Sequence, residues 1–345
     1  MHMIGLDFEK LKYPNNGLYT FCYQLGALLP ACLNDDELLY YYMPEHFRHF
    51  KNNAYRPIPY RWYDRYSFRP PHTHVWHAIH QNPNVWPRKQ ARRIVMTLHD
   101  LNFLFTDKTN HRALLRKIQS QVDDADKVVA ISAFTLECMK EHLRLPEEKT
   151  AVIYNGASVN EFPLFDAPRY RPAAKFLFTI GMLTSKKNFH VLPALLKGND
   201  YELLIAGSPQ GNYVDAIKAE AARHGVSERV KLLGAISEKE KYWYYKNCSA
   251  FLFPSLAEGF GIPVIEAMRF GKPAFISDKT SLPEVGGDVA YYFRDFDEEH
   301  MRKTLEAGLA HYAVTQPEEN IKSHAAQFSW KKTVAAYLDI YRSLY

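Results

Sequence analysis

The stretch FLFPSLAEGFGIPVIEAMRFGKPAFISD, residues 251–278, carries the clearest structural pattern in the chain. It begins and ends with short apolar and aromatic runs, which are typical of strands buried on both faces. Between them lies a loop that contains Gly259 and Gly261, and Pro263 then suits the first position of a helix. The stretch therefore predicts one strand–helix–strand unit of a parallel sheet.

The same alternation of strand and helix patterns runs through the whole chain. Two sets of six candidate strands predict an α/β protein with two doubly wound, Rossmann-like domains. The candidate strands are 3–8, 37–42, 73–79, 94–98, 127–131 and 151–154, followed by 175–180, 201–206, 230–233, 250–253, 273–277 and 289–293.

Two further segments bear on domain organisation. Residues 162–172, FPLFDAPRYRP, hold three prolines and no helical period, and this predicts a linker. Residues 330–345 carry apolar residues at helical spacing, so the last helix needs a surface against which to bury that face.

Composition excludes several classes of protein. The 345 residues are 47% hydrophobic and 23% charged, as in globular proteins, and the net charge of +5 is too small to indicate a nucleic-acid partner. No apolar run reaches the ~20 residues of a membrane span, and no signal peptide is evident. The four cysteines form no C-x-x-C pair, so we expect reduced thiols in a cytoplasmic protein rather than disulfides or a zinc site.

Residues 46–93 differ from the rest of the chain in charge. They hold ten Lys or Arg residues against one acid, Asp64, for a local net charge of +9, together with ten aromatic residues. Such a surface suits anionic headgroups, phosphates or stacked sugars, and we take Arg61 and Trp62 as candidates to contact an acceptor. A long solvated loop whose charges only maintain solubility is the alternative.

Several motifs could face a ligand at the carboxyl edge of a sheet, and each has a plainer interpretation. Gly17, before a helix, would let a diphosphate approach the helix start, or it marks a simple turn. His99 follows a buried strand and could bond a substrate, or it bonds a loop carbonyl. Lys186 and Lys187 would compensate phosphate charge, or they form a solvated pair.

The histidines between residues 72 and 80 cluster without accompanying carboxylates or cysteines. We therefore do not favour a metal site, and we expect His77 and His80 to line a cleft on the acceptor side. Glu258 and Glu266 lie eight positions apart, too far on regular geometry for the ~5–5.5 Å carboxylate pair of a retaining hydrolase. Two separate acids of this kind suit the binding of two different sugar rings.

The sequence from Glu258 to Glu266, EGFGIPVIE, resembles the E-x7-E motif of retaining family 4 glycosyltransferases with the GT-B fold. The similarity is to bacterial polysaccharide and lipopolysaccharide mannosyl- and hexosyltransferases, and it extends over nearly the whole chain. The other matching motifs are NG at 16–17, HD at 99–100, VVAIS at 128–132, VIYNG at 152–156, KKN at 186–188, LLGAI at 232–236, SLPEVGGD at 281–288 and FSW at 328–330.

The resemblance implies a role for each matching position. Gly17 is expected to contact the diphosphate, and Lys187 to neutralise it with Lys186 as a second cation. Glu266 is expected to bind the ribose and Glu258 the donor sugar, while the backbone of Phe260 and Gly261 cradles sugar and phosphate. His99 would contact the reacting sugar, and the backbone of Ala235 and Ile236 would contact the base. Many relatives have an arginine where this chain has Met182 or Lys186, so the second phosphate contact stays open.

These observations together predict a GT-B glycosyltransferase with an acceptor-side domain, 1–164 plus 331–345, facing a nucleotide-sugar domain, 165–330, across a cleft. It would move a hexose, mannose by family resemblance, from a nucleotide diphosphate sugar to a hydroxyl of a saccharide or lipid-linked acceptor, with retention and without metal or cofactor. We expect it in the cytoplasm, either free or peripheral on the inner face of the membrane. A nucleotide-sugar epimerase and a non-catalytic nucleotide-sugar-binding subunit are the alternatives.

Overall fold

The computed structural model describes residues 1–14, 16–50, 54–105, 111–159, 164–165 and 167–345. It divides into two compact units, which we call unit 1 (Met1–Gly156 with Ser329–Tyr345) and unit 2 (Ala157–Phe328). Residues 162, 163 and 166 of the expected linker lie outside the described residues.

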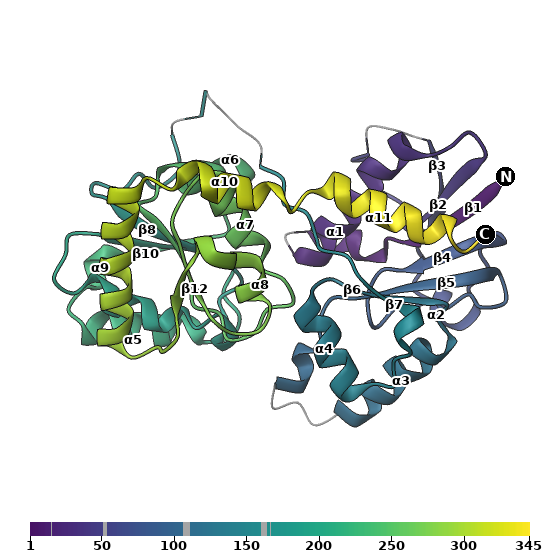
Figure 1. Ribbon diagram of the computed structural model, residues 1–345, viewed down its shortest axis with the longest axis horizontal. Coiled ribbons are helices and arrows are strands. Elements are labelled where there is room, and N and C mark those ends of the chain that lie inside the picture. Colours follow the sequence, from purple (N-terminus) through teal and green to yellow (C-terminus); the bar gives the residue numbers. More distant parts are fainter. Residues whose placement is uncertain (15, 51–53, 106–110, 160–163, 166) are drawn as a thin grey trace. The chain divides into compact units, whose positions relative to one another are not determined.

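Unit 1 is built on a parallel sheet of seven strands in the order β3-β2-β1-β4-β5-β6-β7 (Figure 1). All six strands expected in this half of the chain are confirmed, with ends that differ by a few residues. The strands are β1 (His2–Asp7), β2 (Glu37–Met43), β3 (Tyr55–Pro59), β4 (Thr73–Ala78), β5 (Ala91–Leu98), β6 (Lys127–Ala130) and β7 (Thr150–Val152).

The expected number of six strands in this half was wrong, because the sheet has a seventh strand, β3, which the sequence analysis missed. Its sequence, YRPIP, contains Pro57 and Pro59, which cannot donate to a ladder, and such a strand is tolerated only at a sheet edge. β3 lies at that edge beside β2, with Tyr55 opposite Leu39. The basic, aromatic segment 46–93 is therefore not one long loop.

Helices cover both faces of this sheet. Figure 1 shows α1 and α11 on one face and α3 and α4 on the other, where Ile118 and Met139 pack in one core cluster with Met96 of β5. The helical segments are η1 (Glu9–Lys12), α1 (Gly17–Leu28), η2 (Leu29–Cys32), α2 (Asp64–Ser67), η3 (Asn102–Phe105), α3 (His111–Asp124), α4 (Ala133–His142), η4 (Glu147–Lys149) and α11 (Trp330–Arg342).

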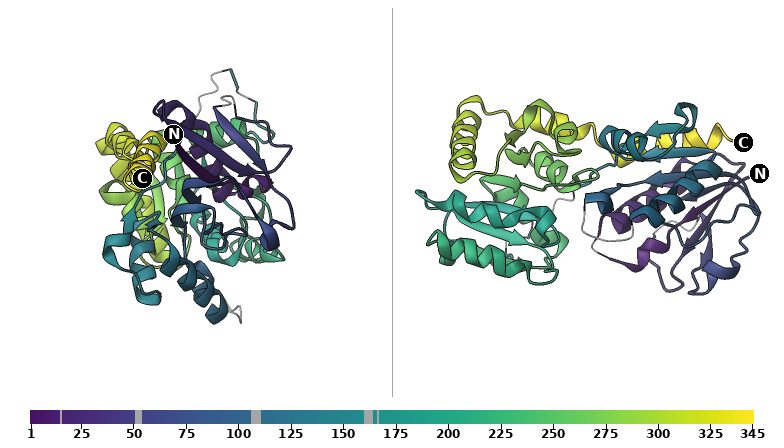
Figure 2. Two further views of the ribbon diagram at one scale, coloured as in Figure 1. Left: turned by 90° about the vertical axis from the view of Figure 1, so that its right-hand side faces the viewer. Right: turned by 90° about the horizontal axis from the view of Figure 1, so that it is seen from below.

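The last helix, α11, belongs to unit 1 although it follows unit 2 in the sequence. Its apolar face is buried, as its spacing predicted, and includes Trp330, Tyr337 and Tyr341. Its end is fixed to β2, because Arg342 donates from Nε and Nη2 to the Glu37 carboxylate at 2.9 and 2.8 Å. Both chain ends lie together at this place, where the rings of His2 and Tyr345 stack at 3.9 Å (Figure 2).

Unit 2 is built on a parallel six-stranded sheet in the order β10-β9-β8-β11-β12-β13, which confirms the six strands expected there. Its strands are β8 (Phe176–Ile180), β9 (Glu202–Ala206), β10 (Val230–Gly234), β11 (Ala250–Phe253), β12 (Ala274–Ser277) and β13 (Tyr291–Phe293). Its helical segments are η5 (Ser185–Lys187), η6 (Phe189–Leu196), α5 (Tyr213–Arg223), η7 (Ser227–Arg229), α6 (Glu238–Asn247), α7 (Ile262–Arg269), α8 (Leu282–Gly286), η8 (Gly287–Val289), α9 (Glu298–Thr315) and α10 (Glu318–Ala326).

The strand order of unit 2 reverses direction between β8 and β11, which are neighbours in the sheet but far apart in the sequence. Open α/β sheets bind their ligands at the carboxyl ends of the strands that flank such a reversal. The chain leaving β8 leads to Lys187, and the chain leaving β11 leads to Glu258.

Among the described residues, no helix combines the length and apolarity that crossing a bilayer requires.

Candidate nucleotide-sugar site

The Lys187 side chain lies over the first residue after β8. A Cβ atom placed on Gly181 would lie 3.3 Å from Cε of Lys187, so the lysine stem crosses close above this glycine. The ammonium group lies 4.9 Å from the centre of the Phe253 ring, near enough for a cation–π contact. Asn188 ends the turn in the left-handed conformation, with φ of 57°.

The Glu258 side chain meets Lys187 directly, in an ion pair whose two side chains are only 13% and 15% exposed. The carboxylate oxygen that contacts the ammonium, Oε1, also accepts a hydrogen bond from Ser255 Oγ at 2.6 Å. The backbone is fixed on both sides, because Glu258 N–H donates to Thr280 Oγ1 at 3.0 Å and Ser281 Oγ donates to Glu258 O at 3.0 Å. The fold therefore brings together two of the predicted residues, 71 positions apart in the sequence.

Three supporting residues of this site, Ser255, Thr280 and Ser281, were not predicted. A sequence signal for them exists, because Ser255 follows β11 almost at once and the other two follow β12 in the same way. Polar residues directly after buried parallel strands gather at one edge of the sheet.

The loop between Glu258 and α7 requires its glycine. Gly261 caps α7 with φ of +114°, and a Cβ atom there would meet Cδ2 of Leu282 at 2.8 Å. Because α7 begins at Ile262, Pro263 takes the second helical position, and the expected first position was wrong. The Phe260 ring is buried against Phe328 with ring centres 5.7 Å apart, so this residue can offer a ligand only its backbone.

Glu266 lies on α7 with its carboxylate buried and already bonded. Lys241 Nζ lies 2.9 Å from Oε1, and Tyr245 OH donates to Oε2 at 3.0 Å. Burial raises the pKa of Glu266, and the Lys241 charge acts against this shift. Burial alone would lower the pKa of Lys241, but the charges of Glu266 and Glu238 raise it. Lys241 and Tyr245 were missed; they lie four positions apart on α6, a spacing that places them on one face of that helix.

Ala235, Ile236 and Lys186, which were also predicted to contact the nucleotide sugar, differ in whether their polar groups are already bonded within the protein. The Ala235 carbonyl, just beyond β10, accepts a hydrogen bond from Arg169 Nη2 at 2.5 Å, so a ligand would compete with that arginine. The backbone of the neighbouring Ile236 remains as the other candidate. Lys186 contributes its carbonyl to Leu256 N–H at 2.9 Å, while its ammonium pairs with none of the residues that the structure describes.

In unit 1, Gly17 is the first residue of α1, whose start is capped by the Asn16 side chain accepting from Tyr19 N–H at 2.7 Å. A Cβ atom on Gly17 would meet nothing within 4 Å, so the protein itself does not require glycine there. His99 is buried and bonds the Ile79 carbonyl through Nε2 at 2.9 Å, which is the plainer of its two interpretations. Burial lowers the pKa of His99 to about 4, so this imidazole is neutral at pH 7.

The prediction that His77 lines an acceptor cleft was wrong. The side chain is fully buried between β4 and α11, with Nδ1 bonded to Tyr341 OH at 2.7 Å and Nε2 to Thr97 Oγ1 at 2.8 Å. Thr97 Oγ1 also bonds Tyr337 OH at 2.8 Å. His77 is thus part of the polar network that holds the last helix on the sheet. His80 is buried as well, at 4% exposure, and does not line an open surface.

His80 does converge with two acids, because donor atoms of Asp7, Glu9 and His80 lie within 4.8 Å of one another. The three buried residues do not fit a metal ion. His80 Nδ1 accepts the Asn82 N–H at 3.1 Å, so the proton of the neutral ring is on Nε2. A metal-bound imidazole needs the opposite arrangement, with its second nitrogen donating.

A second such cluster, Glu220, His224 and Glu298, is already supplied with a cation. Arg223 forms ion pairs with both carboxylates of this cluster. Neither group therefore argues for a metal centre.

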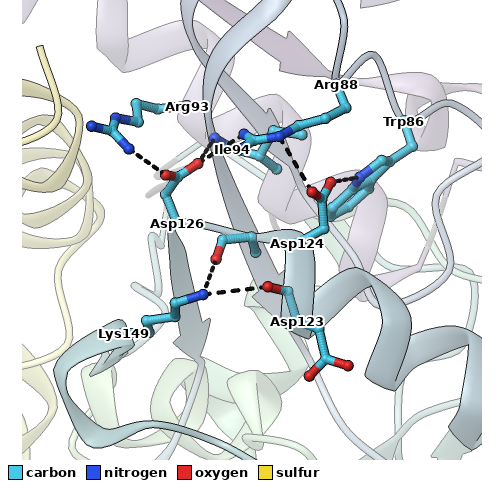
Figure 3. A network of polar contacts seen from close by, with 9 residues as sticks. Trp86, Arg88, Arg93, Ile94, Asp123, Asp124, Asp126 and Lys149 are labelled. Atoms are coloured by element: carbon cyan, nitrogen blue, oxygen red, sulfur yellow. Dashed lines mark hydrogen bonds and ion pairs between the residues drawn. The ribbon is translucent and has the colours of Figure 1, made fainter.

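The basic segment of unit 1 is partly neutralised within the protein. Figure 3 shows Arg88 and Arg93 turned toward Asp126, at 3.0 and 2.8 Å, and Arg88 also lies 3.3 Å from Asp124. Earlier in the segment, Arg61 is exposed and Trp62 is 70% exposed. These two residues line a small pocket together with Tyr42, Tyr60, Arg65 and Asn84.

Comparison with known families follows the same division of the chain. The family described as Glycosyltransferase Family 4 matches residues 30–161, and the family described as Glycosyl transferases group 1 matches residues 165–309. Each half of the chain is therefore similar to a glycosyltransferase family.

Curated relatives of this chain include mannosyltransferases of Escherichia coli. The serotype-specific mannosyltransferase WbdA is 28% identical over 72% of this chain, and the chain spans about one third of that relative's length. The O-antigen chain mannosyltransferase B is 24% identical over 77% of this chain and 74% of its own.

Solved structures share its two-domain GT-B fold. Sucrose-phosphate synthase from Thermosynechococcus elongatus is 17% identical and matches with a TM-score of 0.79 over 100% of this chain and 99% of its own. HepE from Anabaena, in complex with UDP and glucose, is 17% identical and matches with a TM-score of 0.73 over 99% of this chain and 100% of its own.

Proposed function

We propose that this glycosyltransferase moves a hexose, with mannose favoured, from a nucleotide diphosphate sugar to an acceptor hydroxyl with retention of configuration and without a metal ion. The observation that carries the proposal is the Lys187–Glu258 pair at the carboxyl ends of β8 and β11. It sets one cation for phosphate and one acid for sugar hydroxyls side by side where the strand order reverses.

The donor is proposed to lie along the loop that leads into α7. Lys187 and the N-terminal end of α7 would meet the diphosphate, with Lys186 as a second cation. Glu258 would accept from hydroxyls of the sugar, and Glu266 from the ribose, since a carboxylate keeps acceptor capacity beyond its bonds to Lys241 and Tyr245. Nucleotide donors are supported by the HepE structures, which hold UDP and UDP-glucose.

The proposed reaction is a front-face substitution at the sugar. The bond from the anomeric carbon to the phosphate oxygen breaks as a bond to the acceptor oxygen forms on the same face, and the acceptor proton passes to the departing phosphate. Charge then builds on the diphosphate, where Lys187 and the start of α7 would stabilise it. Following the family resemblance, Gly17 of unit 1 would contact the diphosphate and His99 of unit 1 would contact the reacting sugar.

The acceptor is proposed to be a saccharide or lipid-linked saccharide of bacterial surface-polysaccharide assembly, in keeping with the O-antigen names of the relatives. Arg61 and the exposed ring of Trp62 would contact an anionic surface, and the enzyme is proposed to bind peripherally to the inner face of the cytoplasmic membrane. Flotation with phosphatidylglycerol vesicles, but not with phosphatidylcholine vesicles, is the expected result, and equal flotation with both contradicts this part.

The donor proposal is tested by a thermal-shift panel of nucleotide sugars, because a bound donor raises the melting temperature. We expect one nucleotide sugar to shift it clearly and transfer from that donor to survive a chelator. Lys187→Ala and Glu258→Ala should each lose at least ~100-fold in kcat while the chain stays folded, in line with the loss of one group that stabilises transition-state charge. Near-normal kcat in both variants would show that the site lies elsewhere.

A further inference from the structure

Among the residues that the structure describes, Lys187 is the cation that contacts Glu258, and it is also the cation proposed to meet the diphosphate. Resting on the proposed function, we infer that Glu258 sets the preference of this site for the intact nucleotide sugar over the nucleoside diphosphate product. The Glu258 carboxylate pairs with Lys187, and its negative charge repels phosphate. Its remaining acceptor sites can take hydrogen bonds from the hydroxyl groups of a sugar, which favours binding of the intact nucleotide sugar.

The Glu258 carboxylate is held so that it stays beside Lys187. Ser255 Oγ donates to the same oxygen that pairs with the ammonium, and Ser255 is itself fully buried. The position of Ser255 is fixed in turn, because its carbonyl accepts a hydrogen bond from Ser277 Oγ. The backbone of Glu258 is held as well, by hydrogen bonds to Thr280 and Ser281, so both the main chain and the carboxylate of this acid are fixed by partners within unit 2.

The consequence is electrostatic. The pair has no net charge, so a nucleoside diphosphate meets a neutral group rather than a cation, and its phosphates are repelled by the carboxylate. Glu258 Oε2 accepts from none of the residues that the structure describes, so sugar hydroxyls can donate to it. The same acid therefore favours the donor while its sugar is attached and disfavours the product after the sugar has left, which speeds product release.

The test compares free nucleoside diphosphate with intact donor on the full-length chain. Dissociation constants for UDP and GDP, and for UDP-glucose and GDP-mannose, are measured by calorimetric titration for the wild type and for Glu258→Gln. The variant keeps the size of the side chain and removes its charge. We expect it to bind the nucleoside diphosphate about tenfold more tightly, a change of about 1.4 kcal/mol, and to lose most of its preference for the nucleotide sugar.

Two matched variants separate this effect from others. Glu319→Gln removes one negative charge from an exposed pair on α10 of the same unit, and its UDP and GDP affinity should equal that of the wild type. Ser255→Ala keeps the charge of Glu258 but loses the hydrogen bond that orients it, so nucleoside diphosphate affinity should change by less than about twofold while kcat/KM for the donor falls. Glu258→Ala provides a second charge-free variant should the glutamine variant melt early.

The outcomes distinguish the two levels of the argument. If the wild type binds neither nucleoside diphosphate nor nucleotide sugar, the proposed function itself fails. If the wild type binds them and the charge-free variants bind the nucleoside diphosphate no more tightly, the inference is overturned and the proposed function stands. Equal tightening in Glu319→Gln would also overturn it, because the effect would then come from the overall charge of the unit.

Discussion

Replacing Lys241 with methionine should destabilise unit 2 strongly. The Lys241 and Glu266 side chains are 16% and 10% exposed, and their charged atoms lie 2.9 Å apart. Methionine fills a similar volume but leaves the Glu266 carboxylate buried beside Tyr245 without a counter-charge. Breaking a buried pair from one side costs ~3–5 kcal/mol, and because this pair keeps some exposure we expect about 3 kcal/mol.

The assay is calorimetric melting of the full chain, with the neighbouring Glu238→Gln as control. Glu238 also pairs with Lys241 but is 61% exposed, so its loss should cost less than about 1 kcal/mol. A loss of about 3 kcal/mol corresponds to a melting point lower by ~6–12 °C for a unit of this size. Lys241→Met with Glu266→Gln should recover much of the loss, because no buried charge then remains uncompensated.

The pH dependence gives the decisive result. Burial raises the pKa of Glu266, so a neutral carboxyl group is favoured in the fold and its contribution is lost as pH rises through the folded pKa. Without Lys241 this effect grows, and the stability deficit of Lys241→Met should be larger at pH 8 than at pH 5. A deficit that is independent of pH, or no larger than that of Glu238→Gln, would refute the account of this pair.

Two further predictions concern unit 1. Burial and the nearby Glu9 raise the pKa of Asp7 to about 7, so the contribution of Asp7 to stability is complete below pH ~3.8 and is lost as pH rises through about 7. In urea unfolding, Asp7→Asn should remove this pH dependence of the stability. The control Asp123→Asn, at an exposed position, should preserve it. His77→Phe should destabilise unit 1 by ~2–3 kcal/mol, because Thr97 and Tyr341 lose a buried hydrogen-bond partner; a variant of wild-type stability with a raised acceptor KM would instead restore the acceptor role.

The sequence predicted the strands well because buried parallel strands need continuous apolar runs, and these were visible at twelve places. The strand that it missed, β3, has prolines that are acceptable only at an edge, and nothing within residues 55–59 shows that they form an edge. His77 was misjudged for a related reason. The residues that bury it, Tyr337 and Tyr341, come from α11, more than 250 positions later in the chain.

The sheet topology predicted where the residues proposed to bind the nucleotide sugar lie. It did not predict all of the residues with which they form ion pairs. The carboxyl ends of parallel strands meet at one edge, which brought Lys187 to Glu258. The partner of Glu266 depended instead on which face α6 turns toward α7, and the weak apolar pattern of α6 does not fix its rotation. Ser255 gave a sequence signal by its position, but its role required the side-chain geometry.

The two acids of the E-x7-E motif are therefore better regarded as two ion pairs. Each is matched by a lysine from another part of unit 2, Glu258 by Lys187 after β8 and Glu266 by Lys241 on α6. Two largely buried carboxylates facing a diphosphate would otherwise repel it. In the proposed donor complex, the loop would present carboxylate oxygens to the two sugar rings while the charge next to the phosphates stays near zero. A motif written as two glutamates thus names only half of the charges that the fold gathers around this loop.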